Sequence, residues 1–109
     1  YAFVQITTIT GEVNMVKLET TAKSFHLLAD PIRLKILCLL KKQEMCVADL
    51  CRELDLSQPK VSYHLKILLD ADLIERRIVG TWSYYHLSTD LGDWLKNECE
   101  ELLKEAAIN

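Results

Sequence analysis

The chain has 109 residues, of which half are hydrophobic, and its formal net charge at pH 7 is −3. This length fits one domain, and this share of apolar residues excludes a disordered chain. Because no apolar run is long enough to cross a bilayer and no signal-peptide pattern is present, we expect a soluble, cytoplasmic protein with no membrane contact.

Residues 1–14 are rich in Val, Ile and Thr and show no helical period. A natural chain does not begin with Tyr1, and Met15 is a candidate start. We therefore expect residues 1–14 to be a leader or tag-like segment ahead of one domain over residues 15–109. The alternative is that they add a short strand.

Two helices are predicted next. Apolar side chains three and four apart indicate an amphipathic helix over residues 15–29. Asp30 and Pro31 end it and open a second helix, because Pro is favoured in a first helical turn. That helix runs to about Lys42, with Arg33 predicted on its solvent-exposed face and Cys38 predicted to be buried as a small core residue.

A helix-turn-helix is predicted after a turn at residues 43–45. Cys46 opens a short helix, and a brief turn leads to a longer one over residues 57–71. Ser57 is a candidate cap, and Pro59 fits the first turn. One face of the longer helix is apolar, through Val61, Leu65, Leu68 and Leu69. The opposite face combines lysines, hydroxyls and an aromatic ring, which is typical of a helix that reads a DNA groove.

The period then changes from 3.6 to 2, which predicts a β-hairpin turning at Gly80. A helix-turn-helix followed by a hairpin is a winged helix, so the pattern predicts DNA binding. Residues 57–86 are net basic, whereas the acidity is concentrated in residues 87–109, with two lysines against six carboxylates. The candidate DNA-contacting residues are Ser57, Gln58, Pro59, Lys60, Ser62, Tyr63, His64, Lys66, Arg76, Arg77 and Thr81.

The last predicted helix covers residues 90–107 and has an apolar stripe. We expect it to pair, together with the first helix, across a two-fold axis. The alternative is that it folds onto its own subunit. The predicted fold is therefore mainly α with a small β-hairpin, a winged helix-turn-helix that forms a homodimer through its first and last helices.

Four motifs resemble the ArsR/SmtB family of metal- and metalloid-sensing repressors. They are the runs at residues 29–37, 44–51, 57–66 and 80–88. The resemblance implies a homodimeric transcriptional repressor that binds an inverted-repeat operator in double-stranded DNA and leaves it when an inducer binds. The segment around Cys46 is most similar to the arsenic-repressor branch, which implies As(III) or Sb(III) as inducer.

The branch implies thiols at positions 46, 48 and 51, but this chain has Cys46, Ala48 and Cys51. Because five residues turn an ideal helix by about 140°, the two thiols converge only if Cys46 lies before or at the helix cap. A third donor is left open: Cys38, Cys99, solvent or an external thiol. The alternative is that Cys51 fills the core and Cys46 is an incidental surface thiol.

Other readings are also open. The family's zinc position on the last helix keeps Asp90 and Asp93 but lacks a histidine, so we do not expect zinc there. The cysteines could instead sense another thiophilic metal or a redox or sulfur signal, and the winged helix could be a protein-interaction module. We expect no enzyme and no permanent cofactor, because the sequence has no phosphate loop, nucleophile motif or hydrolytic metal constellation.

Overall fold

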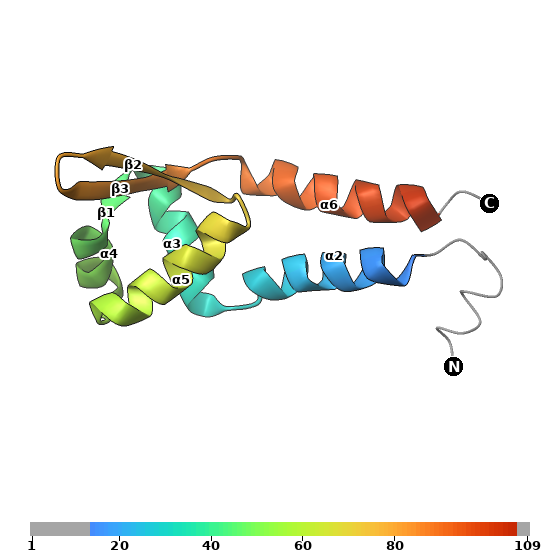
Figure 1. The fold of residues 1–109 in the computed structure, drawn as a ribbon, viewed down its shortest axis with the longest axis horizontal. Helices are drawn as coiled ribbons and strands as arrows, with labels where there is room; N and C mark the ends of the chain where they lie inside the picture. Colours follow the sequence, from blue (N-terminus) through green and yellow to red (C-terminus); the bar gives the residue numbers. More distant parts are fainter. Residues whose placement is uncertain (1–13, 107–109) are drawn as a thin grey trace. The chain divides into compact units, whose positions relative to one another are not determined.

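The computed structural model describes residues 14–106, and Figure 1 shows their helices and strands. The chain divides into two compact units, one covering His26–Asp90 and the other containing the segments before and after it. In chain order the elements are α2 (Met15–Leu28), α3 (Pro31–Lys42), β1 (Met45–Cys46), α4 (Val47–Leu54), α5 (Gln58–Asp70), β2 (Ile74–Val79), β3 (Trp82–Leu87) and α6 (Leu91–Ala106).

Helix α3 begins where the sequence predicts. The Asp30 carboxylate accepts hydrogen bonds from the backbone N–H groups of Ile32 (2.8 Å) and Arg33 (3.1 Å), and Pro31 follows the cap. This cap satisfies two of the N–H groups that have no partner inside the helix. The helix ends at Lys42 and contributes Ile36, Leu37, Leu39 and Leu40 to the core.

Two predictions about the faces of α3 are wrong. Arg33 is predicted on the solvent-exposed face but is only 8% exposed, and Cys38 is predicted in the core but is exposed. The buried stripe of α3 follows positions 33, 36, 37 and 40, at helical spacing. Cys38 lies off this stripe, whereas Arg33 lies on it and is retained there because it has buried polar partners.

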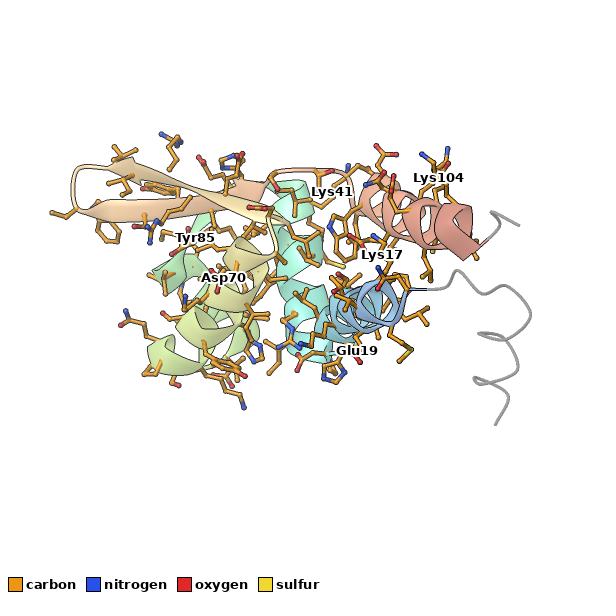
Figure 2. The ribbon with its side chains drawn as sticks, turned by 45° about the vertical axis from the view of Figure 1, so that its right-hand side comes forward. Lys17, Glu19, Lys41, Asp70, Tyr85 and Lys104 are labelled. Carbon is orange, nitrogen blue, oxygen red and sulfur yellow. The ribbon has the colours of Figure 1, made fainter. Side chains whose placement is uncertain are left out.

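Residues 45 and 46 form a strand that the sequence does not predict. Met45 pairs with Tyr85 and Cys46 with Tyr84, so that β1 joins a three-stranded antiparallel sheet in the order β1-β3-β2. The buried side chain of Tyr85 lies on β3 (Figure 2). The predicted turn is therefore shorter than expected, and Cys46 belongs to the sheet as well as to the start of α4.

The helix-turn-helix prediction is confirmed by α4 and α5. Asp55, with a φ of 55°, ends α4, and Pro59 lies in the first turn of α5. Ser57 occupies the cap position, but its side chain makes no capping hydrogen bond. The predicted apolar face of α5 is buried at Val61, Leu65 and Leu68 and half-buried at Leu69.

The hairpin prediction is also confirmed. Strands β2 and β3 pair from Ile74↔Leu87 to Val79↔Trp82, which leaves a two-residue turn at Gly80 and Thr81. Gly80 has a φ of +62°, a conformation that glycine adopts without a steric cost. This hairpin is the wing of the winged helix, and its tip carries exposed apolar side chains at Ile78, Val79 and Trp82.

Helix α6 and the part of α2 up to Phe25 belong to the other unit, whereas the last residues of α2, from His26 to Leu28, belong to the His26–Asp90 unit. Asn14 caps α2, because its Oδ1 accepts from the backbone N–H of Val16 at 2.8 Å, whereas residues 1–13 of the predicted leader lie outside the described residues. In α6, none of the described side chains is buried within this chain. No helix in the described part of the chain is long and apolar enough to cross a membrane.

Candidate DNA-binding face and thiol pocket

The polar face of α5 is accessible, as a DNA-contacting face must be. Tyr63 is 62% exposed, and its ring packs against the His64 ring in a T-shaped arrangement with 5.1 Å between the ring centroids. The wing residues Arg76, Arg77 and Thr81 are exposed as well. The predicted contact residues of α5 and its cap that are exposed are Ser57, Gln58, Pro59, Lys60, Ser62, Tyr63 and Lys66.

The four cations on this face differ in their partners. Lys66 is paired with Asp70, one turn further along α5, at 3.2 Å. Arg77 is paired with Glu44. Within residues 14–106, Lys60 and Arg76 make no ion pair, so these two have their charges available for a phosphate.

The Arg77–Glu44 pair connects the wing to the segment before β1. The Arg77 Nε donates to Glu44 Oε2 at 3.0 Å, and the guanidinium carbon lies 5.5 Å from the centre of the Tyr84 ring. The hydrogen bond from Arg77 holds the pKa of Glu44 below its ordinary value, and the same bond raises the pKa of Arg77. Contact between Arg77 and DNA stays a prediction, and in this structure its charge is neutralised within the chain.

His64 does not lie on the exposed face and is assigned to the core instead. It is 5% exposed, and its Nδ1 lies 3.1 Å from Nη1 of Arg33. Because arginine only donates, Nδ1 must accept, which makes His64 a neutral ring protonated on Nε2. Arg33 Nε also donates to the backbone oxygen of Leu27 at 2.6 Å. Arg33 and His64 thus fix α5 against α3 and the end of α2.

This contact predicts a pH-dependent stability. Burial lowers the pKa of His64, so as pH falls below its unfolded value of about 6.5 the unfolded chain takes up the proton first. The contribution of His64 is therefore complete above that pH and falls below it, by at most about 1.4 kcal/mol per pH unit, until the folded protein is protonated too. His64→Asn keeps an acceptor near Nδ1 but does not titrate. Denaturant unfolding of both proteins from pH 7.5 to 5 should show a steeper loss for the wild type, and parallel curves would contradict the assignment.

The two candidate thiols line one pocket of about 400 Å³. Its walls come from three places: the start of α4, the start of α5 and the tip of the wing. The lining residues are Cys46, Val47, Ala48, Cys51, Gln58, Thr81, Trp82 and Ser83. Gln58 and Thr81 are also candidate DNA-contacting residues, and the sequence gives no periodic signal that they share a pocket with the cysteines.

Cys46 satisfies the condition for the two thiols to converge, because it is the N-cap residue of α4 with an extended backbone. Its backbone N–H donates to Asp49 Oδ2 at 3.3 Å. Hydrogen bonds from the Cys46 side chain and backbone hold the pKa of Asp49 below its ordinary value. Cys46 is 7% exposed and Cys51 is half-buried, so the alternative that Cys46 is an incidental surface thiol is wrong.

A third protein donor is not supplied at this pocket. Ala48 lines it where the arsenic-repressor resemblance implies a thiol, and both Cys38 and Cys99 are exposed and lie outside its lining. Among the described residues, no three His, Cys, Asp or Glu side chains are grouped so that they could hold a metal ion. The site therefore offers two sulfur donors and fits a three-thiolate ion only in part.

Comparison with known proteins places this geometry in a family. A family model described as bacterial regulatory protein, arsR family, matches residues 30–76. The arsenical resistance operon repressor of Bacillus subtilis (strain 168) is 46% identical over 77 residues, covering 70% of this chain and 73% of that protein. The arsenical resistance operon repressor of Escherichia coli (strain K12) is 44% identical over 78 residues, covering 71% and 67%.

A solved structure agrees with the fold. It is that of a homodimeric winged helix-turn-helix DNA-binding domain from Mycobacterium bovis, described as a possible ArsR-family transcriptional regulator. The two chains are 27% identical, and their superposition has a TM-score of 0.63 and covers 80% of this chain and 84% of that one. The matched segment of the family model contains α3, α4 and α5, which form the core and the exposed polar face. The chain belongs to the arsR family of bacterial regulatory proteins and is a DNA-binding transcriptional regulator.

Proposed function

We propose that this protein is a cytoplasmic transcriptional repressor that binds operator DNA as a homodimer and is released when As(III) or Sb(III) binds to Cys46 and Cys51. The observation that carries the proposal is the shared pocket, which brings both thiols together with Gln58 of α5 and Thr81 of the wing. A ligand held there is in contact with both parts of the candidate DNA-binding face.

DNA binding is supported by the exposed polar face of α5. Short polar groups and Lys60 lie on it, with the buried apolar face behind them. We expect α5 to enter the major groove, with Gln58, Ser62 and Tyr63 contacting bases or phosphates, and the cations contacting phosphates only. Two copies of α5 in a symmetric dimer would reach grooves about one turn of the duplex apart.

Dimerisation is supported by the apolar side chains of α6. Leu95 is 37% exposed and Leu103 is 62% exposed, whereas the predicted stripe needs a partner to bury it. The relative from Mycobacterium bovis is homodimeric, which supports a dimer of this chain. We infer that α6, together with α2, forms the contact between two copies of this chain.

Release requires that the occupied pocket favours a shape that does not fit DNA. Cys46 is the N-cap residue just before α4, and Cys51 lies about one turn into the helix, so a bridge between their sulfurs would fix the start of that helix. Gln58 and Thr81, on the opposite walls, would be displaced or held apart from DNA. A coupling free energy on the order of 1–3 kcal/mol reduces operator affinity about 5- to 150-fold.

The test is a release titration. A duplex selected by the protein from a random library is labelled, and binding is followed by fluorescence anisotropy at several salt concentrations. We expect salt-dependent binding and loss of binding on addition of arsenite. Binding that is unchanged at saturating arsenite would overturn the inducer, and absence of any salt-dependent duplex binding would favour a protein-interaction module. Release by an oxidant alone, blocked by Cys46→Ser, would favour the redox alternative.

The Glu44–Arg77 pair predicts an unusual gain in affinity. Glu44→Gln removes the charge that neutralises Arg77, so Arg77 becomes available for a phosphate. We expect tighter DNA binding at low salt and a plot of log K against log salt that is steeper by about 1.8, because each of the two protomers adds one phosphate contact with a slope of about 0.9. Glu53→Gln, which removes an exposed carboxylate of α4 that makes no ion pair among the described residues, is the matched control. Equal slopes for the two variants would show that Arg77 does not contact DNA.

A further inference from the structure

A second groove lies between α5 and the wing. Its volume is about 570 Å³, which is within the range of sites that hold small organic ligands. One wall is a face of α5, and the other is formed by β2 and β3, so both walls belong to the His26–Asp90 unit. The groove shares no lining residue with the thiol pocket, and a ligand held in it would not touch the cysteines.

The floor of this groove is apolar except for one hydroxyl group. Leu65 is 1% exposed, Tyr85 is 6% exposed and Leu69 is half-buried. Tyr85 lies on the β3 wall and Asp70 on the α5 wall (Figure 2). Within residues 14–106 the Tyr85 hydroxyl makes no hydrogen bond, and it is not sealed from solvent. The hydroxyl is therefore open to the groove, where it can donate to a ligand.

The rim of the groove carries cations. Arg76 is opposite Tyr85 in the pairing of β2 with β3, so the two side chains lie on the same face of the sheet. Arg76 makes no ion pair within the described residues. On the α5 side, Ser62 is exposed, and Lys66 uses one of its three N–H donors for Asp70 at 3.2 Å. The groove thus offers an unpaired guanidinium, two hydroxyls and an ammonium, and its single carboxylate is already paired.

We propose that this groove is a seat for one phosphate ester, with the phosphate on Arg76, Tyr85 and Ser62 and the attached sugar against Leu69. Guanidinium and hydroxyl groups donate to phosphate oxygens, and the apolar floor suits the carbon atoms of a sugar ring. This inference rests on the proposed function, because the groove lies between the two candidate DNA-contacting elements. The same chemistry is presented by the DNA backbone and by a free nucleotide.

The seat has two consequences for recognition and release. A backbone phosphate in it would be bound by α5 and the wing together, which fixes the wing against the helix on DNA. Tyr85 then contacts DNA although it belongs to the core, so no pattern of exposed polar residues could identify it. A free nucleotide in the seat would compete with the DNA strand, which provides a route to release that does not involve the thiols.

Tyr85→Phe tests the seat because it keeps the buried ring and removes only the hydroxyl. Fluorescence anisotropy with the selected duplex should show affinity at least about 10-fold weaker, the loss of a hydrogen bond to a charged group. The salt dependence should not change, because a neutral hydroxyl releases no counterion. Tyr84→Phe is the matched control, since the Tyr84 ring lies beside Arg77 and does not line the groove, and it should bind as the wild type does.

Arg76→Gln should change the salt dependence instead. The plot of log K against log salt should be shallower by about 1.8, because each of the two protomers loses one phosphate contact with a slope of about 0.9. Arg52→Gln removes an exposed arginine of α4 that does not line the groove, and it should keep the slope of the wild type.

Duplexes that each contain one methylphosphonate, which carries no charge, locate the phosphate itself. One position in each half of the operator should weaken the wild type at least about 10-fold, the same loss of a charge-assisted contact. The same substitution should have little effect on Tyr85→Phe combined with Arg76→Gln, because this variant has already lost the seat. A variant that was only misfolded would not lose its sensitivity at one position alone.

Thymidine 3′,5′-bisphosphate, titrated into the protein without DNA, tests the free source. Nuclear magnetic resonance should show a shift of the Arg76 side-chain N–H signal, with an affinity that Tyr85→Phe weakens about 10-fold. Thymidine, which has no phosphate, should cause no such shift.

The outcomes separate the two sources and the two proposals. A sensitive methylphosphonate position without a bisphosphate shift assigns the seat to the DNA backbone, and the reverse result assigns it to a free ligand. Absence of both would overturn the seat and leave the repressor and its release by arsenite standing. If the wild type bound no duplex at all, the proposed function would fail, and the bisphosphate titration would still decide the seat.

Discussion

Leu95→Asp combined with Leu103→Asp should convert the protein to a monomer that no longer holds its operator. Both side chains are exposed on α6 in the single chain, and the proposed dimer buries them. Two carboxylates in an apolar interface would each lose hydration without gaining a partner, at a cost of several kcal/mol. Sedimentation velocity should show the monomer mass. In the dimer, binding of one α5 holds the second α5 close to the other half of the operator. In the monomer this link is lost, so operator affinity should fall about 100- to 10,000-fold.

The control for this pair lies on the same helix. Asn97→Asp combined with Lys104→Asp adds at least as much negative charge to α6 at two positions outside its apolar stripe. This variant should remain dimeric and should retain most of its affinity for DNA. If the leucine variant stays dimeric, α6 is not the contact between subunits. If it becomes monomeric but still binds with full affinity, the paired-groove model of recognition is wrong.

Cys46→Ser and Cys51→Ser should each abolish the response to arsenite while leaving DNA binding intact. The two thiols share a pocket, so removal of either converts a chelate into a single-thiolate contact. The arsenite concentration that releases half of the DNA should rise at least about 100-fold, the typical advantage of a linked second contact. Fluorescence anisotropy of the selected duplex measures both the affinity and its response.

The serine variants of the two other cysteines are the matched controls. Cys38 and Cys99 are exposed and do not line the pocket. Cys38→Ser and Cys99→Ser should therefore respond as the wild type does. Loss of the response in either control would show that this cysteine supplies a third donor, from the same or the other subunit, and the two-thiol site would have to be revised.

Much of the fold follows from periodicity in the sequence. The spacing of Val61, Leu65 and Leu68 predicts the buried face of α5, and the alternation on both sides of Gly80 predicts the wing. Strand β1 could not be predicted in this way, because two residues are too few to show a period. Its existence depends on pairing with β3, which is distant in the sequence.

The errors at Arg33 and His64 have a common origin. Charged residues are predicted at the surface because burial without a partner is costly, and Arg33 has partners in His64 and Leu27 that no local pattern indicates. His64 is predicted on the DNA-binding face, but its position on α5 borders both faces, and its buried partner Arg33 lies on α3. The pocket likewise depends on the approach of the wing tip to α4 and α5, which sequence spacing does not contain.

The pairing of β1 has a consequence for exchanging wings between related proteins. Cys46 lies opposite Tyr84, which in turn lies opposite Arg77, so one row across the sheet joins the thiol to the wing. Insertion of one residue in β3 between Tyr84 and Leu87 would reverse which side chains face inward. Replacement of only the hairpin tip, from Ile78 to Ser83, by the tip of a related protein keeps the pairing of β1 and β2 with β3 in register. Hybrid regulators with new wing tips should therefore fold, whereas cuts closer to α6 should not.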